Sequence, residues 1–157
     1  MVIALGVAIQ LARKGVDHLI VRRVAPPARI ARSVLLGDRR GHALAVVPSD
    51  RQIDLDALNR EFGRELRVSP SSEVQALFPS TSPGAIPPVA VSDGMELYLD
   101  DSLVRLPEVY LETGDHRQLV RLDGEAFREL FYGSWCGAIS KPAPARRQPR
   151  RHLLRPA

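Results

Sequence analysis

The residues best placed along the sequence to do chemistry together are Thr113-Gly114-Asp115-His116, which bring a hydroxyl, a carboxylate and an imidazole close together. Glycine permits a sharp turn, and a turn would present these polar side chains at one point. Such a turn could bind or orient a polar substrate, and His116 can change its charge near neutral pH. Gly-Asp is equally at home in a plain β-turn, so a structural role stays open beside the functional one.

A second candidate is the segment Gly84-Ala85-Ile86-Pro87-Pro88, whose residue types predict a stiff loop. Gly84 can adopt backbone angles closed to other residues, and each proline fixes its own φ and favours extended geometry in the residue before it. Prolines do not join the centre of a sheet, so the loop would offer open backbone amides at its glycine end. A rigid loop of this kind can carry function on a scaffold, or it can simply connect a helix to a strand.

Other catalytic classes leave no local signature. The sequence contains no glycine-rich phosphate loop, no His-Glu-x-x-His, no cysteine pair and no Gly-x-Ser-x-Gly elbow. Asp100-Asp101 is better explained as a turn or helix cap than as a catalytic pair, because adjacent strand residues point to opposite faces. Cys136 follows the last expected helix, and His18 has no second metal ligand at a suitable spacing. We therefore expect neither a metal nor another cofactor.

The composition indicates one globular domain followed by a basic tail. The chain has 157 residues, of which 45% are hydrophobic and 25% charged. Residues 141–157 hold six basic residues and no acidic ones, which leaves 16 Lys+Arg against 18 Asp+Glu, or −2, for residues 1–140. We expect a domain over residues 1–135 and a disordered tail over 136–157. The tail could add non-specific affinity for RNA or DNA, or it could be a solvated appendage.

Cysteine content and the apolar beginning of the sequence bear on location. The single cysteine, Cys136, excludes an internal disulfide and fits a reducing, cytoplasmic setting. The apolar run 1–11 has no basic residue ahead of it and falls short of the roughly 20 residues that span a bilayer. We expect this run to be a core helix. Only 5% of residues are aromatic, which argues against a stacking platform for single-stranded nucleic acid.

The elements that must position the two candidate loops follow from apolar patterning and turn signals. Helices are expected over residues 2–14, 55–62, 71–78 and 124–131, with short helical turns at 28–31 and after 100–102. Strands are expected over residues 18–21, 33–36, 42–47, 65–68, 96–99, 108–112 and 119–122. Asp54, Ser69 and Asp123 are the expected helix N-caps.

The runs 33–36 and 42–47 are almost wholly apolar and flank a short glycine-containing turn. They predict a central hairpin that is buried on both faces, with Arg39 and Arg40 solvated at its tip. Strands and helices are intermixed without a regular βαβ repeat. This order predicts a single α+β domain with a curved, mixed β-sheet flanked by short helices.

Several segments occur together in an order and spacing that is more specific than any one of them. They are Ile30-Ala31-Arg32-Ser33-Val34-Leu35-Leu36, Leu44-Ala45-Val46-Val47-Pro48, Ile53-Asp54-Leu55, Val74-Gln75-Ala76-Leu77-Phe78, Gly84-Ala85-Ile86-Pro87-Pro88, Asp100-Asp101-Ser102-Leu103 and Glu108-Val109-Tyr110-Leu111-Glu112-Thr113-Gly114-Asp115-His116. From about residue 15 to 131 this combination resembles the YbaK/EbsC family of aminoacyl-tRNA deacylases. That family is related to the editing insertion of bacterial prolyl-tRNA synthetase.

The resemblance implies the YbaK/prolyl-tRNA synthetase-associated domain fold and a trans-editing hydrolase that maintains translation fidelity. Such an enzyme cleaves, without metal, the ester that joins a wrong amino acid to the 3′ end of tRNA. A water attacks the ester, helped by the substrate's own ribose hydroxyl and by backbone groups, and positioning carries much of the catalysis. The implied partners are the aminoacyl-tRNA 3′ end and an aminoacyl-tRNA synthetase, with no membrane. The implied catalytic positions are Arg32, Gly84, Gly114, Asp115 and His116, and the implied substrate-binding positions are Ser33, Ala85, Ile86, Pro87, Pro88 and Thr113.

The sequence departs from the family pattern in two places. Arg32 stands where the family usually has a lysine, and arginine keeps the charge but is bulkier and differs in geometry. Residues 24–30 are shorter than the family's helical stretch at that place. Both departures favour an alternative, a catalytically inactive module of the same fold that binds tRNA or a synthetase. A third interpretation is a general nucleic-acid-binding protein that binds through its basic tail. The mildly acidic charge of residues 1–140 gives this interpretation little support.

Overall fold

The computed structural model describes residues 11, 12, 14, 15, 17–22, 24–82, 86–88 and 95–144. Of the helix expected over residues 2–14, Leu11 and Ala12 are described and are helical. The amides of Lys14 and Gly15 donate to the carbonyls of Leu11 and Ala12 at 3.1 and 3.0 Å, and Gly15 has a φ of 69°. Glycine adopts this left-handed conformation without strain, in agreement with the expected helix end at residue 14.

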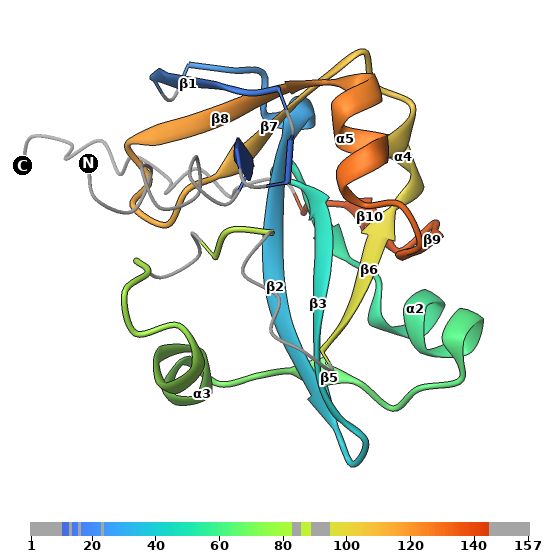
Figure 1. Ribbon diagram of the computed structural model, residues 1–157. Helices are drawn as coiled ribbons and strands as arrows, with labels where there is room; N and C mark the ends of the chain where they lie inside the picture. Colours follow the sequence, from blue (N-terminus) through green and yellow to red (C-terminus); the bar gives the residue numbers. More distant parts are fainter. Residues whose placement is uncertain are drawn as a thin grey trace, which may run out of the picture.

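A mixed β-sheet forms the centre of the molecule (Figure 1). Its strands are β1 (Leu19–Arg22), β2 (Ile30–Asp38), β3 (Gly41–Pro48), β5 (Arg67–Val68), β6 (Glu96–Asp100), β7 (Glu108–Glu112), β8 (Gln118–Asp123) and β9 (Trp135–Gly137). Their order is β1-β8-β7-β2-β3-β6-β9, and β5 also pairs with β2. The pairs β2–β7, β3–β6 and β6–β9 are parallel, and the others are antiparallel. A separate two-stranded sheet joins β4 (Arg51–Ile53) to β10 (Ser140–Pro142).

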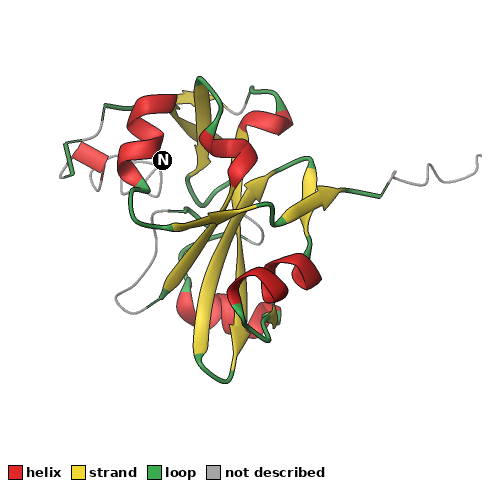
Figure 2. Ribbon diagram, turned by 90° about the vertical axis from the view of Figure 1, so that its right-hand side faces the viewer, coloured by secondary structure: helices red, strands yellow, loops and turns green. Residues whose placement is uncertain are grey.

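Short helices pack around this sheet. They are α2 (Leu55–Phe62), α3 (Ser71–Leu77), α4 (Asp101–Val104) and α5 (Gly124–Leu130), with a 3₁₀ turn η1 (Pro27–Arg29). In Figure 2 the upper strands cross the long hairpin strands, as a strongly twisted sheet requires. The predicted α+β class with a curved mixed sheet and short helices is therefore confirmed.

Aspartates at the helix starts explain where two helices begin. Asp54 Oδ1 accepts a hydrogen bond of 3.0 Å from the amide of Ala57, and Gly63 ends α2 with a φ of 61°. Asp123 Oδ1 accepts one of 2.7 Å from the amide of Ala126 at the start of α5. These bonds satisfy amides that have no partner inside the first turn, as the sequence predicts.

Asp100 also caps a helix, whereas Ser69 does not. The Asp100 carboxylate accepts from the amide of Ser102 at 3.3 Å, so the Asp100-Asp101 pair is a helix cap. The expected Ser69 cap of α3 is wrong by one residue. The Pro70 carbonyl accepts from the amides of Glu73 and Val74 at 3.0 and 3.2 Å, which makes Pro70 the N-cap.

The predicted central hairpin is confirmed by β2 and β3. Their ladder runs from Ala31 opposite Pro48 to Asp38 opposite Gly41, which leaves Arg39 and Arg40 at the tip. Both strands lie in the middle of the sheet and are buried on both faces. Burial on both faces accounts for their nearly continuous apolar sequence.

One face of the sheet, which we call the α5 face, is covered at its two ends by different elements. At one end Val46 of β3 packs with Phe127 of α5 in a cluster of buried side chains. Toward the hairpin tip, Leu35 lies opposite Leu44 and packs with it and with Ile86. Helix α3 adds Val74 to this second cluster.

The opposite face, which we call the α2 face, packs Val47 of β3 and Tyr98 of β6 against Leu58 of α2. Ile139, between β9 and β10, is fully buried in the same cluster. Figure 1 shows α2 and α3 on opposite sides of the β2–β3 hairpin, in agreement with these two sets of contacts. Along each strand, alternate residues therefore enter different environments.

The C-terminal region corrects the expected domain boundary. Residues 136–142, which we expected in a disordered tail, form most of β9 and all of β10. The amide of Asp54 donates to the carbonyl of Ile139 at 2.8 Å, and the amide of Ile139 donates to Asp100 at 3.1 Å. Burial of Ile139 and strand pairing outweigh the local proline and charge signals here. Residues 145–157 lie outside the described residues.

None of the helices within the described ranges is long and apolar enough to cross a membrane.

Candidate active site

Ser33 is the polar side chain that β2 contributes to the α5 face. It lies opposite Val46 in the β2–β3 ladder, and directly opposite residues share a face of the sheet. The residue is only 3% exposed, and its hydroxyl has no hydrogen-bond partner among the described residues. A buried hydroxyl without a partner costs about 1–3 kcal/mol, which makes Ser33 a candidate contact for a polar ligand group.

Ile86, in the described segment Ile86–Pro88, lies on the same face of β2 as Ser33. All three residues are buried, and Ile86 packs on Leu35, two residues along β2 from Ser33. The side chains of Ser33 and Leu35 share a face because strand residues alternate. Gly84 and Ala85, the glycine end of the expected loop, lie outside the described residues.

The turn Thr113–His116 follows the end of β7. Thr113 is buried, and its Oγ1 lies 3.0 Å from the Gln118 carbonyl oxygen and 3.1 Å from Asp115 Oδ1. The same Asp115 oxygen accepts from the amide of Arg117 at 2.9 Å. Gly114 and His116 have φ values of 108° and 59°, and His116 is exposed. The Asp115 carboxylate thus stabilises the turn, which is the structural role that the sequence left open for this motif beside a functional one.

The environment of Asp115 changes its acidity. Burial acts to raise the pKa of the carboxyl, but the amides of Arg117 and Gln118 and the Thr113 hydroxyl outweigh it. The pKa of Asp115 is therefore below its ordinary value, because these groups stabilise the charged form. Asp115 remains a carboxylate at neutral pH, which suits an acceptor better than a proton donor.

The structure brings Ser33, Ile86 and the Thr113 turn to one region. The amide of Ser82, close before the Ile86 segment, donates to the carbonyl of Gly114 at 2.7 Å. Parallel pairing of β2 and β7 sets Ala31 opposite Leu111, and Ser33 and Thr113 each follow two residues later. Two of the segments implied by the resemblance therefore flank the same stretch of β2.

Arg32 does not join this group. It lies opposite Val47, whose side chain belongs to the α2 face. Its Nη2 donates to the Arg51 carbonyl at 2.9 Å, and burial lowers the pKa of the guanidinium. Arg51 in turn donates from Nε to Ser140 Oγ at 2.7 Å. Ser33 and Arg32 are neighbours in sequence, but alternation sends their side chains to opposite faces.

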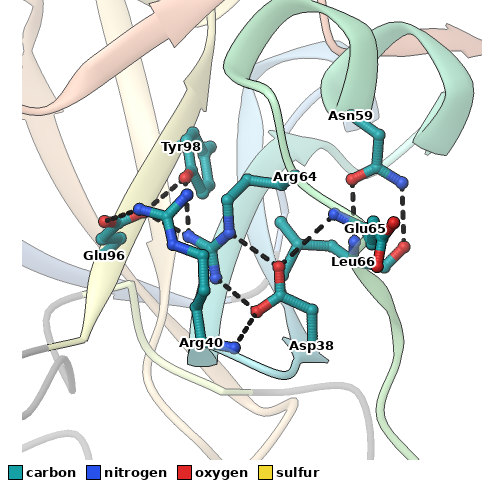
Figure 3. Close-up of polar contacts among 8 residues, drawn as sticks. All are labelled: Asp38, Arg40, Asn59, Arg64, Glu65, Leu66, Glu96 and Tyr98. Atoms are coloured by element: carbon teal, nitrogen blue, oxygen red, sulfur yellow. Dashed lines mark hydrogen bonds and ion pairs between the residues drawn. The ribbon is translucent and has the colours of Figure 1, made fainter.

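Sequence reasoning missed a buried network at the hairpin tip, in which Arg64 is the central residue (Figure 3). Arg64 donates from Nε and Nη2 to the two Asp38 oxygens at 2.7 and 2.8 Å. Its Nη1 donates to Glu96 at 2.5 Å and to the Tyr98 hydroxyl at 3.0 Å. The Arg64 guanidinium holds the pKa of Asp38 far below its usual range, and Asp38 raises that of Arg64. Asp38 lies at the end of β2, and Glu96 and Tyr98 lie in β6, so no local spacing could reveal these partners.

The pair His42–Glu73 was also missed. His42 Nε2 lies 3.0 Å from Glu73 Oε2, although 31 positions separate the two residues in the chain. The His42 ring lowers the pKa of the Glu73 carboxyl. Within the described ranges, no three His, Cys, Asp or Glu side chains are grouped so as to hold a metal ion.

Solved structures share this fold. A candidate trans-editing enzyme for prolyl tRNA synthetase is 24% identical, with a TM-score of 0.75, over 88% of this chain and 97% of its own. A designed scaffold for presenting linear epitopes has the same identity and TM-score over 90% and 98% of the two chains. A candidate signal transduction protein from Marinobacter aquaeolei VT8 is 25% identical, with a TM-score of 0.72, over 85% of this chain and 30% of its own.

The family assignment comes from the sequence rather than from these likenesses. No curated protein matches the chain. A family model, the aminoacyl-tRNA editing domain, matches residues 14–130. This range agrees with the resemblance expected over residues 15–131 and covers most of the chain. The chain belongs to the aminoacyl-tRNA editing domain family.

Proposed function

We propose that the protein hydrolyses the ester bond of mischarged aminoacyl-tRNA in the cytoplasm, in trans to the synthetase that made it. Membership of the editing-domain family supports this reaction class. A structural neighbour described as a candidate trans-editing enzyme for prolyl tRNA synthetase supports the trans arrangement. An aminoacyl-tRNA synthetase is then a candidate partner.

The observation that carries the proposal is the buried Ser33 hydroxyl without a partner. Ser33 follows Ala31, which pairs with Leu111, and precedes Leu35, which packs on Ile86. In the proposed complex its hydroxyl bonds to a polar atom of the aminoacyl group or of the terminal ribose. A hydrogen bond to a polar substrate atom would offset the cost of burying the Ser33 hydroxyl without a partner. We assign substrate binding to Ser33, Ala85, Ile86, Pro87, Pro88 and Thr113.

In the proposed reaction a water oxygen bonds to the ester carbonyl carbon. The bond from that carbon to the ribose oxygen breaks, and the ribose oxygen takes up a proton. The products are the free amino acid and a tRNA with its 3′-terminal hydroxyl restored. Backbone groups near Gly84 and Gly114 position the ester and stabilise the developing oxyanion, and the substrate's own ribose hydroxyl assists. Asp115 holds the turn in shape and His116 borders it. Neither a metal ion nor a protein nucleophile takes part.

Single-turnover hydrolysis of alanyl-, cysteinyl- and seryl-tRNA tests this proposal. We expect one of the three to be hydrolysed well above the rate without protein, and dialysis against EDTA to leave that rate unchanged. Loss of activity on dialysis would contradict the metal-independent mechanism. Absence of hydrolysis with every substrate would contradict the enzyme itself.

The position of Arg32 favours a second candidate function. Its guanidinium bonds to Arg51 on the α2 face and is not directed at the Ser33 region. A module that binds tRNA or a synthetase without hydrolysis would need no catalytic cation near Ser33. Saturable tRNA binding with no hydrolysis of the three substrates would establish this second function.

A further inference from the structure

Three residues lie level with one another on neighbouring strands near the hairpin tip. In β2, Gly37 is opposite His42 of β3 on one side and opposite Arg67 of β5 on the other. Directly opposite residues share a face, so His42 and Arg67 flank a position that has no side chain. Gly37 is an even number of residues from Ser33, so this is also the α5 face.

The missing side chain at Gly37 leaves a cradle that a larger residue would fill. A Cβ built there would lie 3.4 Å from the His42 ring and 3.4 Å from Ser69 Oγ. A cavity of about 530 Å³ opens over this floor, and Arg39 and Glu73 also line it. In Figure 1 the tip of the β2–β3 hairpin is at the bottom, and α3 lies to the left of the hairpin. We call this cavity the Gly37 cradle.

The charges around the Gly37 cradle favour an anion. Arg39 and Arg67 are exposed, and neither forms an ion pair with any residue that the structure describes. Both carboxylates of the cavity are already engaged. Asp38 is held by two hydrogen bonds from Arg64, and Glu73 by the His42 ring. The guanidinium groups of Arg39 and Arg67 are therefore available to bind an anionic ligand.

A buried hydroxyl adds a donor to these cations. Ser69 is 8% exposed and lines the cavity. Its Oγ helps to lower the pKa of Glu73, although it makes no hydrogen bond of normal geometry within the described chain. Guanidinium groups, a hydroxyl and a glycine floor together suit a tetrahedral oxyanion with several acceptor oxygens.

We propose that the Gly37 cradle binds a backbone phosphate of an RNA whose aminoacylated 3′ end lies at Ser33. Gly37 lies four positions along β2 from Ser33, which is about 13 Å at the rise of an extended strand. A single-stranded 3′ end spans that distance within a few nucleotides. The inference rests on the proposed function, because that function supplies the RNA. It gives the substrate a second contact on the same face as the ester.

The test is binding of deacylated tRNA to the full chain over a range of salt concentrations. Arg67→Gln is expected to weaken binding about fivefold at 0.1 M salt and to reduce the slope of log K against log salt by about 0.7–0.9. Arg60→Gln removes another exposed arginine, on α2, and is expected to change neither the affinity nor the salt slope. Equal effects of the two variants would overturn the proposal.

A second pair of variants leaves the charge unchanged. Gly37→Ala fills the floor of the cradle and is expected to weaken tRNA binding, with the melting temperature showing that the fold is kept. Gly137→Ala is the control, since its Cβ would meet Phe62 at an ordinary 3.5 Å. Wild-type affinity in Gly37→Ala would contradict the proposed cradle.

Titration with inorganic phosphate, followed by NMR of the His42 ring signals, distinguishes binding of a free phosphate from binding of an RNA backbone phosphate. We expect saturable shifts in the wild type and none in Arg67→Gln. Phosphate binding without any effect of Arg67→Gln on tRNA would overturn the RNA assignment. None of these measurements needs hydrolysis, so the cradle and the proposed deacylase can fail independently.

Discussion

Ser33 and Arg32 show how much depends on a single step along a strand. The two polar side chains are adjacent in sequence, yet one is buried without a partner and the other is bonded to Arg51. The sequence identifies both as candidates but cannot assign a face, because β2 is apolar on both sides. Only the pairing with Val46 and Val47 separates them.

Ser33→Ala is expected to stabilise the protein by about 1 kcal/mol, since it removes a buried hydroxyl that has no partner. Thr113→Val is the control. The Thr113 hydroxyl lies 3.0 Å from the Gln118 carbonyl oxygen, so its removal is expected to lower the stability of the protein. Urea denaturation of the two variants checks this. A loss of stability in Ser33→Ala as large as in Thr113→Val would contradict the account of Ser33.

Asp115→Ala is expected to destabilise the protein by about 1–2 kcal/mol at pH 7, because the Arg117 and Gln118 amides lose their acceptor. The folded-state pKa of Asp115 is lowered, so its charge contributes stability above the unfolded value of about 3.9. That contribution is lost as the pH falls below this value. Urea denaturation at several pH values should therefore show the difference shrinking toward low pH, and a constant difference would argue against it.

The elements were predictable to different degrees. The β2–β3 hairpin and the Asp54-capped helix α2 carry complete local signals, and both are confirmed. Strand β9 ends in a glycine and β10 carries a lysine and a proline, residue types that favour a loop. The two strands form because β6 and β4 offer partners. The Gly37 cradle could not be predicted either, because it combines residues from three strands that only the folded sheet brings together.

Arg64 fastens the hairpin tip to the segment after α2 and to β6. Arg64→Ala would leave the Asp38 carboxylate buried without its bidentate partner, which is strongly destabilising. We expect a fall in melting temperature on the order of 5 °C or more. Arg40→Ala is the control, since Arg40 is exposed and 3.8 Å from Glu96. Similar melting temperatures for the two variants would contradict the role given to Arg64.

At the scale of the whole molecule, the C-terminal strands join the two sheets to α2. A chain ending at residue 144 keeps β9 and β10 and is expected to unfold at the same urea concentration as the full chain. A chain ending at residue 134 loses the fully buried Ile139, a side chain worth about 1.5–3 kcal/mol by burial alone. We expect its unfolding midpoint to fall clearly. Equal midpoints would show that these strands do not belong to the fold.

The α5 face unites the proposed functions. It carries Ser33 and Ile86, with the Gly37 cradle about 13 Å further along β2 than Ser33 by the rise of an extended strand. The α2 face carries the Arg64 network and the Arg32–Arg51 contact, which hold the fold together. In the proposed function the α5 face binds the substrate, and the α2 face supports the fold.

The measurement that tests this account most directly is the single-turnover rate on the mischarged tRNA that the wild type hydrolyses, compared for Ser33→Ala and Arg32→Ala. We predict that Ser33→Ala slows hydrolysis about tenfold, the effect of one lost hydrogen bond of about 1.4 kcal/mol, and that Arg32→Ala slows it less. A wild-type rate in Ser33→Ala together with loss of activity in Arg32→Ala would place the chemistry on the α2 face and contradict the account.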